Sequence, residues 1–365
     1  AQNMSISTSP FLRPWIEVSN CTIDATSAST AHGLKFGTED GNVIINHPQI
    51  RIRDSNINMI STSSAIYFAH VKGAYVTQLD IEVEDSNIIT TNVGSNNYFF
   101  FFMEGTSAIS TVNIRRSTID LNCTANTSSS SILRLHEIKG SDMSFVTEDS
   151  SLEIAGYNRF SSYFVVDDST ISGLSNIIRR CDVFISAYMG CVFMHEDQVK
   201  YLGGVMEMTD STINVPAQMS AFGIGVSTAT LLKDIVVSTT NTTVAVSGMV
   251  NYVTFFSNGF YSLAQNVTFD LDNSYFNMTS SRNPLNAASL EGIYRTIYPG
   301  IDPVRTASLI IQINGSRFLN STVRMVDSTA DINAYNSSGV VMSFLSCQIA
   351  SGSSLIFDNT TVRST

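Results

Sequence analysis

Apolar and polar residues alternate in a short phrase that returns along the whole chain. Five copies of it read IRIRDSNI, DIEVEDSNI, VNIRRSTI, VMEMTDSTI and FDLDNSYF. Each copy ends near an apolar marker residue, and nine of the ten intervals between successive markers span 30 to 34 residues. A fixed period of this size is the signature of a solenoid. The markers are Ile23, Ile57, Ile88, Ile119, Leu152, Val183, Ile213, Val244, Phe276, Phe318 and Ile349.

Apolar and small residues recur at the same positions in each phrase, and their spacing follows the period of a strand. Positions five and seven before the marker are mostly apolar, and position two before it is always Ser, Thr or Cys. Steps of two residues indicate a strand, whereas a helix would repeat every 3.6 residues. We therefore expect the small residues to stack as one core ladder, formed by Cys21, Ser55, Ser86, Ser117, Ser150, Cys181, Ser211, Thr242, Ser274, Ser316 and Cys347.

The residue three before the marker breaks this alternation. Continued alternation would point it inward, yet most copies hold Asp, Asn or Arg there, as at Asp54, Asp85 and Asn241. Asp and Asn tolerate left-handed backbone and bond their own main chain, so we expect a bend between two strands at this point. The rest of each period supplies a third strand, as in AIYFAHV, NYFFFFM and SILRLHEI.

The sequence thus predicts an all-β protein, a parallel β-helix (β-solenoid) with about 11 coils of about 31 residues and three strands per coil. We expect one domain over residues 1–365, with an N-terminal arm at 1–15. A protruding loop insertion is expected at 280–306, within the longest interval. A β-sandwich or a propeller is the alternative, although a propeller repeat needs four strands and about 40 residues.

These features resemble those of known extracellular β-helices. The three strands, the Asn/Asp bend and the small-residue ladder are similar to right-handed parallel β-helices of the pectin-lyase-like superfamily. The phrase SFLSCQIASGSSLIFDNTTV is also similar in style to dispersed-gene-family surface glycoproteins of trypanosomes. The first resemblance implies a right-handed coil in a superfamily with many polysaccharide lyases and hydrolases.

Composition narrows the class of protein further. Only 14% of the residues are charged and the net charge is -11, which argues against nucleic-acid binding because phosphate contacts need clustered Lys and Arg. No apolar run reaches the roughly 18 residues of a transmembrane segment. The chain starts without a basic and apolar leader, which is typical of a mature, secreted form.

Eleven Asn-x-Ser/Thr acceptors, beginning with Asn3, agree with a secreted, cell-surface or filament protein that carries N-linked glycans. We expect glycosylation at Asn20, Asn122, Asn126, Asn241, Asn266, Asn277, Asn314, Asn320, Asn336 and Asn359.

The five cysteines do not suggest a disulfide framework. Cys21, Cys181 and Cys347 hold the same slot in coils that are five apart, or about 24 Å, so they cannot pair with one another. We expect buried free thiols in a slot the size of Ser. A bridge between Cys181 and Cys191 is the alternative.

Histidines recur on the third strand beside acidic residues. This pattern favours either a carbohydrate or metal site or a solvated turn face, and we expect the latter, with no metal and no cofactor. His70 and His136 would lie two coils, about 10 Å, apart, too far to share one ion. The residues are His70, His136 and His195, with Glu104, Glu137, Glu196, Asp167, Asp168 and Asp197.

We do not expect an enzyme. Polysaccharide cleavage needs paired carboxylates, or an acidic Ca²⁺ site beside a base. The Asn-Thr-Asp and Gly-His-Gly phrases of polygalacturonase-like hydrolases are absent, and Asp167–Asp168 matches their double Asp only as a dipeptide. A chain of net charge -11 would also repel acidic substrates.

The predicted function is therefore that of a non-catalytic extracellular structural protein, a glycosylated β-helix subunit of a surface coat or filament that assembles end to end. Its partners would be copies of itself, by head-to-tail stacking or by strand donation from the N-terminal arm, because a β-helix leaves open edges at both ends. The alternative is a polysaccharide lyase or glycoside hydrolase, or a carbohydrate-binding adhesin. Contact residues are expected in the loop insertion, at Tyr294, Arg295, Tyr298 and Arg305.

Overall fold

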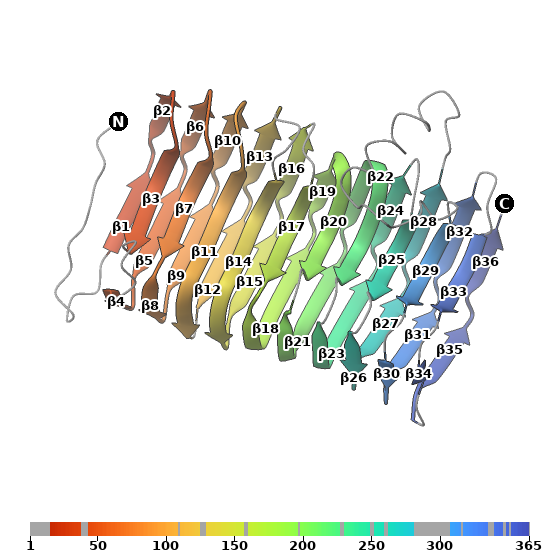
Figure 1. The fold of residues 1–365 in the computed structure, drawn as a ribbon. Helices are drawn as coiled ribbons and strands as arrows, with labels where there is room; N and C mark the ends of the chain where they lie inside the picture. The colour runs from red at the N-terminus through yellow and green to blue at the C-terminus, as the bar shows by residue number, and fades with distance from the viewer. Residues whose placement is uncertain are drawn as a thin grey trace.

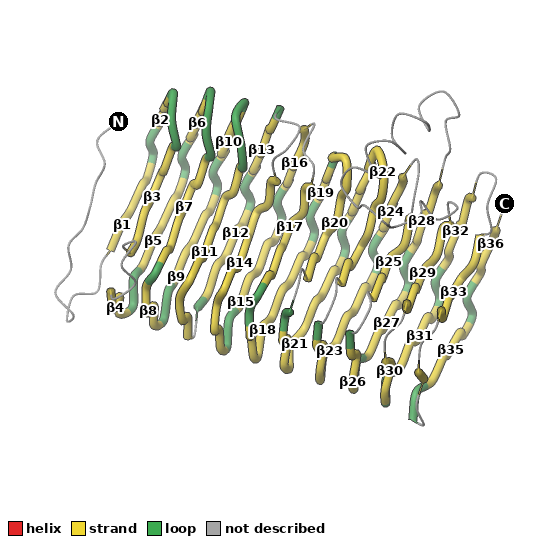
Figure 2. The backbone as a smooth tube through the Cα atoms, in the orientation of Figure 1, coloured by secondary structure: helices red, strands yellow, loops and turns green. Residues whose placement is uncertain are grey.

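The chain folds into a solenoid of parallel strands that stack along one axis (Figure 1). The computed structural model describes residues 15–37, 43–108, 110–124, 129–156, 160–195, 198–226, 230–248, 252–258, 262–280, 307–314, 317–334, 339–345, 348–349 and 352–364. Within these ranges all regular structure is β, and no helix occurs (Figure 2). The prediction of an all-β parallel solenoid with a period of about 31 residues is confirmed.

One coil illustrates the others. β9 (Asp80–Glu84) leads through a corner to β10 (Asn87–Asn92), and a short loop then leads to β11 (Asn97–Ala108). Each strand lies in register on its counterpart one coil away, so that Ile88 of β10 pairs with Ile57 of β6 (Asn56–Ser61) and with Ile119 of β13 (Thr118–Cys123).

Three long ladders run the length of the described chain. The first comprises β1 (Trp15–Ser19), β5 (Gln49–Arg53), β9, β12 (Thr111–Arg115), β15 (Ser144–Glu148), β18 (Thr170–Arg179), β21 (Lys200–Thr209), β23 (Leu231–Thr240), β27 (Thr268–Asp272), β31 (Thr322–Val326) and β35 (Ser354–Asp358). The second comprises β2 (Thr22–Ser27), β6, β10, β13, β16 (Ser151–Gly156), β19 (Asp182–Ile185), β22 (Thr212–Val226), β24 (Thr243–Gly248), β28 (Tyr275–Ser280), β32 (Thr329–Ala334) and β36 (Thr361–Ser364). The third comprises β3 (Ala31–Gly37), β7 (Ile66–Lys72), β11, β14 (Ser129–Ser141), β17 (Phe160–Asp167), β20 (Ala187–His195), the end of β22, β25 (Tyr252–Asn258), β29 (Ala307–Asn314) and β33 (Gly339–Leu345).

A short fourth segment follows the third strand of each coil. It forms the separate strands β4 (Val43–Asn46), β8 (Ala74–Thr77), β26 (Leu263–Gln265), β30 (Arg317–Leu319) and β34 (Gln348–Ile349), and it merges with longer strands elsewhere. Left-handed residues mark its start, as at Gly73 (φ 58°) and Glu104 (φ 52°). The sequence pattern did not separate this segment from the strand before it.

The interior is one continuous apolar core. The strands of the first two ladders alternate between buried and half-buried residues, so every second side chain of β5, β9 and β12 points inward. Ile50, Ile81 and Val112 stack in successive coils at 1%, 1% and 2% exposure. This explains the steps of two residues in the sequence, because each inward column needs an apolar residue in every coil.

The predicted bend is a left-handed corner in coil after coil. Asp54, Asp85, Arg116 and Asp149 have φ values of 49°, 49°, 46° and 50°. The next residue is the small one: Ser86 Oγ accepts from the Ser55 amide at 3.2 Å and donates to the Glu84 carbonyl at 2.8 Å. A hydroxyl is needed here because it satisfies a buried amide that the bend removes from the strand ladder.

The predicted register of the last two coils is wrong. Phe276 pairs with Ala330, whereas Phe318 pairs with Ala264 and Ile349, so the markers Phe318 and Ile349 belong to the short fourth ladder. The core ladder continues instead at Ser328, whose Oγ accepts from the Ser274 amide 54 residues earlier. The phrases around Phe318 and Ile349 have the same alternation as the corner phrase, which is why the sequence placed them one ladder away.

Several predicted features lie outside the described residues. These are residues 1–14 of the expected arm, residues 281–306 of the expected loop with Tyr294, Arg295, Tyr298 and Arg305, and the ladder residues Ser316 and Cys347. No disulfide joins the described cysteines, Cys21, Cys123, Cys181 and Cys191, so the alternative bridge between Cys181 and Cys191 is absent. Cys21, in the first described coil, is exposed and not buried as expected.

Candidate functional site

The outward surface of β3, β7 and β11 carries a group of stacked rings, which we call the ring face: His32, Tyr67, His70, Tyr98 and Phe101. The third strand has an extra inward residue, because Phe99 and Phe100 both belong to the core. Tyr98 and Phe101, on either side of that pair, lie outside the core cluster. The Phe101 ring stacks on Tyr67 and His70 of the neighbouring coil, and the Tyr98 ring is tilted against Tyr67. The register brings Tyr98 onto Tyr67 and Phe101 onto His70.

Four rings of the ring face stack at interplanar angles of 8° to 23°, and the fifth, Tyr98, is tilted by 41° against Tyr67. The centroids of Tyr67 and His70 are 4.6 Å apart, and those of His32 and Tyr67 are 5.2 Å apart. His70 and Phe101 stack at 5.2 Å. Because each ring covers its neighbour, His70, Tyr98 and Phe101 are only 6%, 3% and 7% exposed although they do not face the core.

A polar cluster of Arg134, His136 and Asp167 adjoins the ring face in the next two coils. The Asp167 carboxylate accepts from the Arg134 guanidinium through one oxygen and contacts His136 Nδ1 through the other. The three side chains are 17%, 24% and 7% exposed. Arg134 also donates to the Tyr98 hydroxyl at 2.9 Å, which joins the polar cluster to the ring face.

Several polar atoms of this surface are buried and have no hydrogen-bond partner within the described part of the chain. Both ring nitrogens of His70 are in this state, and so are the hydroxyls of Ser131 and Ser162, which follow Tyr98 in the same column of the register. Ser131 and Ser162 are 1% and 0% exposed. Such groups are rare in folded proteins and call for a specific explanation.

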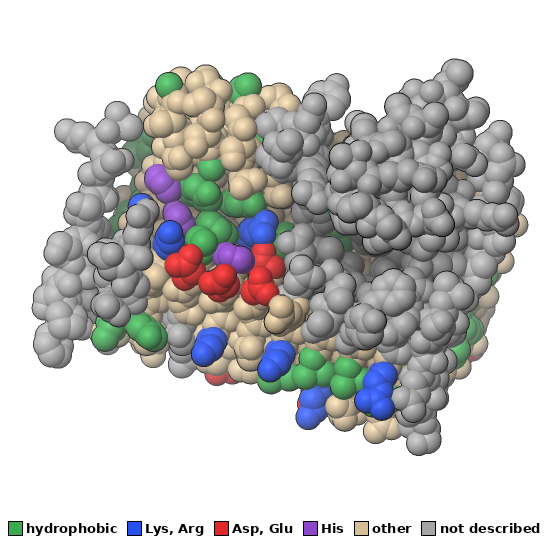
Figure 3. All heavy atoms as spheres, in the orientation of Figure 1, with side chains coloured by type: hydrophobic (Ala, Val, Ile, Leu, Met, Phe, Trp, Pro, Cys, Tyr) green, Lys and Arg blue, Asp and Glu red, His purple; other side chains and the backbone are tan. Residues whose placement is uncertain are grey.

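The electrostatic setting keeps His70 neutral. Burial lowers the pKa of His70 to about 4, and the positive charges of His32, Lys35 and Lys72 act in the same direction. Burial likewise lowers the pKa of His32 and raises that of Tyr67. Histidine, basic and acidic side chains can be seen together on this side of the molecule in Figure 3.

The sequence prediction of a solvated turn face is wrong for two of its residues. His70 and Asp167 are buried, whereas Glu137 is 54% exposed at its side chain. His70 and His136 also occupy different columns, since His70 stacks on Phe101 and His136 pairs with Met103. The side chain of His195, with Glu196 and Asp197, lies outside the described residues; in the described part, no three metal-ligating side chains converge.

Sequence reasoning did not find Tyr67, Tyr98, Phe101 or Arg134. A signal was present, since AIYFAHV and NYFFFFM place aromatic residues at matching positions one period apart. This signal does not by itself identify the outward rings. Every residue from Tyr98 to Phe102 is aromatic, so the sequence does not show which of these rings face the core and which face outward.

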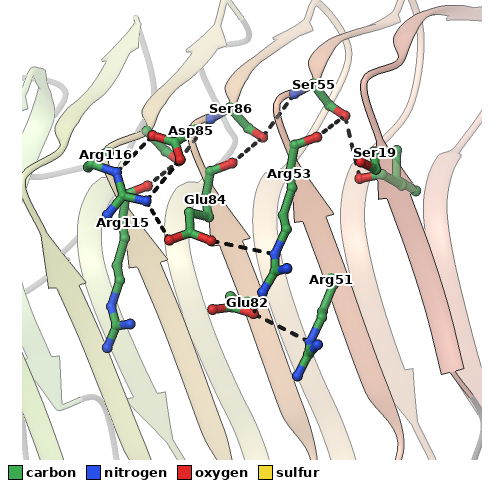
Figure 4. A network of polar contacts seen from close by, with 12 residues as sticks. Ser19, Arg51, Arg53, Ser55, Glu82, Glu84, Asp85, Ser86, Arg115 and Arg116 are labelled. Carbon is green, nitrogen blue, oxygen red and sulfur yellow. Dashed lines mark hydrogen bonds and ion pairs between the residues drawn. The ribbon is translucent and has the colours of Figure 1, made fainter.

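The outward surface of the first ladder is different in kind. Here a charge ladder of Arg51, Arg53, Glu82, Glu84, Asp85 and Arg116 links successive coils (Figure 4). Arg53 lies 2.7 Å from Glu82, and Arg116 Nε lies 2.8 Å from Asp85. The Arg116 guanidinium holds the pKa of Asp85 below its usual value. Each of these charged groups has an opposite charge in the next coil.

The predicted glycosylation acceptors fall mainly at corners. Asn20, Asn241, Asn266, Asn320 and Asn359 are exposed and have positive φ, while Asn122 and Asn277 are half-buried within strands. The side-chain nitrogens of Asn241 and Asn266 donate to Asp210 and Asp234 at 2.6 and 2.7 Å. Asn126, Asn336 and the side chain of Asn314 lie outside the described residues.

Comparisons with known proteins yield structural neighbours alone. No family model and no curated protein matches the chain, so the resemblance to trypanosome glycoproteins gains no support. Among solved structures, a point mutant of the periplasmic alginate epimerase AlgG is similar at a TM-score of 0.26 and 9% identity, covering 84% of this chain and 77% of that one. The unmodified epimerase gives a TM-score of 0.20 at 8% identity, covering 87% and 77%. Across the described residues, no helix has the length and apolar character to cross a membrane.

Proposed function

We propose that this protein binds a saccharide chain along the outward surface formed by the ring face and the polar cluster. The observation that carries the proposal is a set of polar atoms on His70, Ser131 and Ser162 that have no hydrogen-bond partner among the described residues and that share their register columns with rings of the ring face. A ligand with hydroxyl groups would supply the missing hydrogen bonds once the side chains that cover these atoms move aside.

The chemistry of the surface suits a sugar. Sugar rings offer apolar C–H faces and rows of hydroxyls, and binding sites of this kind combine aromatic walls with a few fixed polar groups. Tyr67 and His32 are half-buried, so part of each ring is accessible at the rim. Arg134 and Asp167 hold one another in place, which fixes their remaining hydrogen-bonding directions. The ring face and the polar cluster follow one another over the successive coils of β3, β7, β11, β14 and β17, about 4.8 Å apart, which favours an extended polymer over a single sugar.

We propose binding without cleavage of the chain. Both oxygens of Asp167 are already engaged, one by Arg134 and one by His136, so this carboxylate is better suited to orient its neighbours than to react. We also propose that the protein is exported and carries N-linked glycans on the exposed corner acceptors. Export agrees with the acceptor sites in the sequence and with the periplasmic location in the names of the structural neighbours.

The test is a binding screen of the purified protein against neutral and acidic polysaccharides, followed by Tyr67→Ala. Loss of one aromatic contact should weaken binding about threefold to tenfold. Tyr75→Ala is the matched control, because Tyr75 is 52% exposed on β8 outside the ring face, and it should leave affinity unchanged. Absence of binding to any polysaccharide, or equal effects of the two variants, would overturn the proposal. New reducing ends or unsaturated products would overturn its non-catalytic part.

A second candidate function is that of a structural subunit in a surface coat or filament that assembles end to end. Its support is the in-register pairing of the first ladder from β1 to β35, which builds a rod with a regular outer surface. Electron microscopy of the purified protein would separate filaments from single rods.

A further inference from the structure

We propose that His32, Lys35, His70 and Lys72 form a binding site for a tetrahedral oxyanion, a sulfate or phosphate group. His32 and Lys35 lie on β3, and His70 and Lys72 lie on β7. We call these four side chains the basic cluster. The inference deepens the proposed function and rests on it, because the oxyanion is a substituent of the bound saccharide. Sulfate and phosphate also occur as free ions, and the experiment distinguishes the two sources.

The register of two neighbouring strands brings the basic cluster together. Lys35 pairs with His70, and the rings of His32 and His70 stack with their centroids 5.3 Å apart. Lys72 follows His70 on the same strand, and Val71 between them belongs to the core, so both of these side chains point outward. Histidine and basic side chains are visible together on this side of the molecule (Figure 3). Four nitrogen-bearing side chains therefore share the outward surface of two adjacent coils.

The basic cluster lacks acidic partners. In the described part of the chain, neither Lys35 nor Lys72 forms an ion pair. Glu104 follows Met103, the register partner of Lys72, but it is exposed and no ion pair joins it to Lys72. Both lysines lower the pKa of His70, and no described acidic side chain raises it. In a chain of net charge -11, this leaves a locally positive surface that an anion would neutralise.

The nitrogens of the two histidines point to a ligand. His32 Nδ1 and both ring nitrogens of His70 are buried, and no described residue makes a hydrogen bond with them. A protonated imidazole donates from both of its nitrogens, and a lysine ammonium group donates three hydrogen bonds. An oxyanion only accepts hydrogen bonds, so it is complementary to such a set of donors.

The polar cluster shows what the basic cluster is missing. Lys35, His70, Phe101 and Arg134 follow one another in a single outward column of the register. At one end of that column, Asp167 of the neighbouring coil accepts from the Arg134 guanidinium. At the other end, no described carboxylate pairs with Lys35. The chain thus supplies a counter-charge for the arginine and leaves the lysine for an external anion.

The number and arrangement of the donors favour a tetrahedral group over a carboxylate. A sulfate or phosphate ester presents three acceptor oxygens in different directions, whereas a carboxylate presents two in one plane. The donors of the basic cluster occupy three register columns, those of His32, His70 and Lys72. Lys35 is exposed and Lys72 is half-buried. Because both ammonium groups sit on long flexible stems, they can fold over the anion as the side chains that cover His70 move aside.

Oxyanion binding at this site is coupled to proton uptake. Burial and the positive neighbours lower the pKa of His70 to about 4, and a bound anion would reverse the effect of the charges and raise this pKa. The affinity should therefore rise as the pH falls below neutrality. The titratable groups packed around His70 lie on β3 and β7, while β11 contributes the uncharged ring of Phe101. These groups are His32, Lys35, Tyr67 and Lys72.

The experiment compares dextran sulfate with uncharged dextran by calorimetric titration of the whole protein. The sulfated chain should bind at least about tenfold more tightly. Lys35→Gln and Lys72→Gln should each weaken its binding about threefold to tenfold, and so should His70→Phe, which keeps the ring but removes both nitrogens. Lys200→Gln is the matched control, because Lys200 is an exposed lysine on β21 outside the ring face, and it should leave the affinity unchanged. Melting curves establish that each variant is folded.

The outcomes separate the oxyanion site from the function that it rests on. Weaker binding in the three cluster variants, with Lys200→Gln unchanged and protons taken up during the titration, would support the site. Equal binding of the two polymers, or an equal loss in Lys200→Gln, would overturn it and leave saccharide binding in place. Polygalacturonate that binds as tightly as dextran sulfate would overturn the choice of a tetrahedral group over a carboxylate.

Inorganic sulfate provides the test that does not depend on a saccharide. If no polysaccharide binds in the screen, the proposed function fails, and a titration with sodium sulfate followed through the NMR signals of His70 decides the site alone. Saturable shifts that Lys35→Gln reduces would support an oxyanion site for the free ion. Signals that do not respond to sulfate would overturn the site as well.

Discussion

The charge ladder and the ring face are both outward surfaces of the same solenoid. They differ in how far their polar groups are exposed to water and in whether those groups have partners. In the charge ladder, Arg53 and Glu82 find partners one coil apart, and both stay in contact with water. In the ring face, His70 is nearly inaccessible, and no described residue makes a hydrogen bond with either of its nitrogens. Surface ion pairs contribute little to stability, whereas an unsatisfied buried polar group is costly.

This difference separates a structural surface from a functional one. In the charge ladder, opposite signs in successive coils face each other, and even Arg51 Nε and Arg53 Nε, which make no hydrogen bond among the described residues, lie 3.4 and 3.5 Å from Glu82 and Glu84. The ring face and the polar cluster leave hydrogen-bonding capacity that the described residues do not fill. Proteins keep such groups where a ligand or another chain uses them, which is why we place the binding site here and not on the charge ladder.

The largest expected effect comes from breaking the buried ion pair. Asp167→Asn leaves the Arg134 guanidinium, only 17% exposed, without its counter-charge, and should lower the free energy of unfolding by about 3 kcal/mol. Denaturant unfolding measures this. Asp85→Asn is the matched change in the charge ladder, and its effect should fall within the error of the measurement because Arg116 is well exposed. Equal losses in the two variants would contradict the distinction between the surfaces.

A smaller effect distinguishes a satisfied hydroxyl from an unsatisfied one. Ser117 Oγ accepts from the Ser86 amide at 3.2 Å and donates to the Arg115 carbonyl at 2.7 Å. Ser117→Ala should therefore lower the free energy of unfolding by about 1–3 kcal/mol, because the buried amide loses its acceptor. Ser131→Ala removes a hydroxyl that has no partner, and should be neutral or slightly stabilising. A destabilised Ser131→Ala would show that its hydroxyl is already bonded in the free protein.

The smallest expected effect is a difference in pH dependence. The pKa of His70 is lowered to about 4 in the folded protein, from 6.5 for an unperturbed histidine. Between these values the unfolded chain binds a proton that the folded chain does not, so the stabilising contribution is complete above pH 6.5 and is lost as the pH falls toward 4. His70→Phe should remove this loss, which amounts to at most about 1.4 kcal/mol per pH unit. Unfolding curves for both proteins from pH 7.5 to 4 measure it; parallel profiles would contradict the assignment.

The sequence was sufficient to predict the architecture of the coil but not the residues of the ring face. The small residues at Ser55, Ser86 and Ser117 could be aligned because a side-chain hydroxyl accepts from a corner amide at the same place in successive coils. The same reasoning failed at Phe318 and Ile349, because the fourth ladder also turns before an inward apolar residue. Local alternation cannot tell two corners of the same coil apart.

The ring face could not be predicted for a related reason. A period of two holds only until Phe99 and Phe100, which both point inward and reverse the faces of the residues that follow. The sequence analysis listed both His136 and Asp167 among the polar residues of the third strand. Their contact depends on the register between β14 and β17, which only the structure gives. The partner of Asp167 that matters most for stability, Arg134, carries no sequence signal of its own.

The hydroxyl at each corner serves only the coil beside it, and this has a consequence for how such a protein changes length. Residues 281–306 are inserted between β28 and β29, yet Val244, Phe276 and Ala330 remain in one column across the insertion. Whole repeats can therefore be duplicated or lost during evolution without a new packing solution. The number of coils, and with it the length of the rod, can therefore change while each coil keeps the same packing on its neighbours.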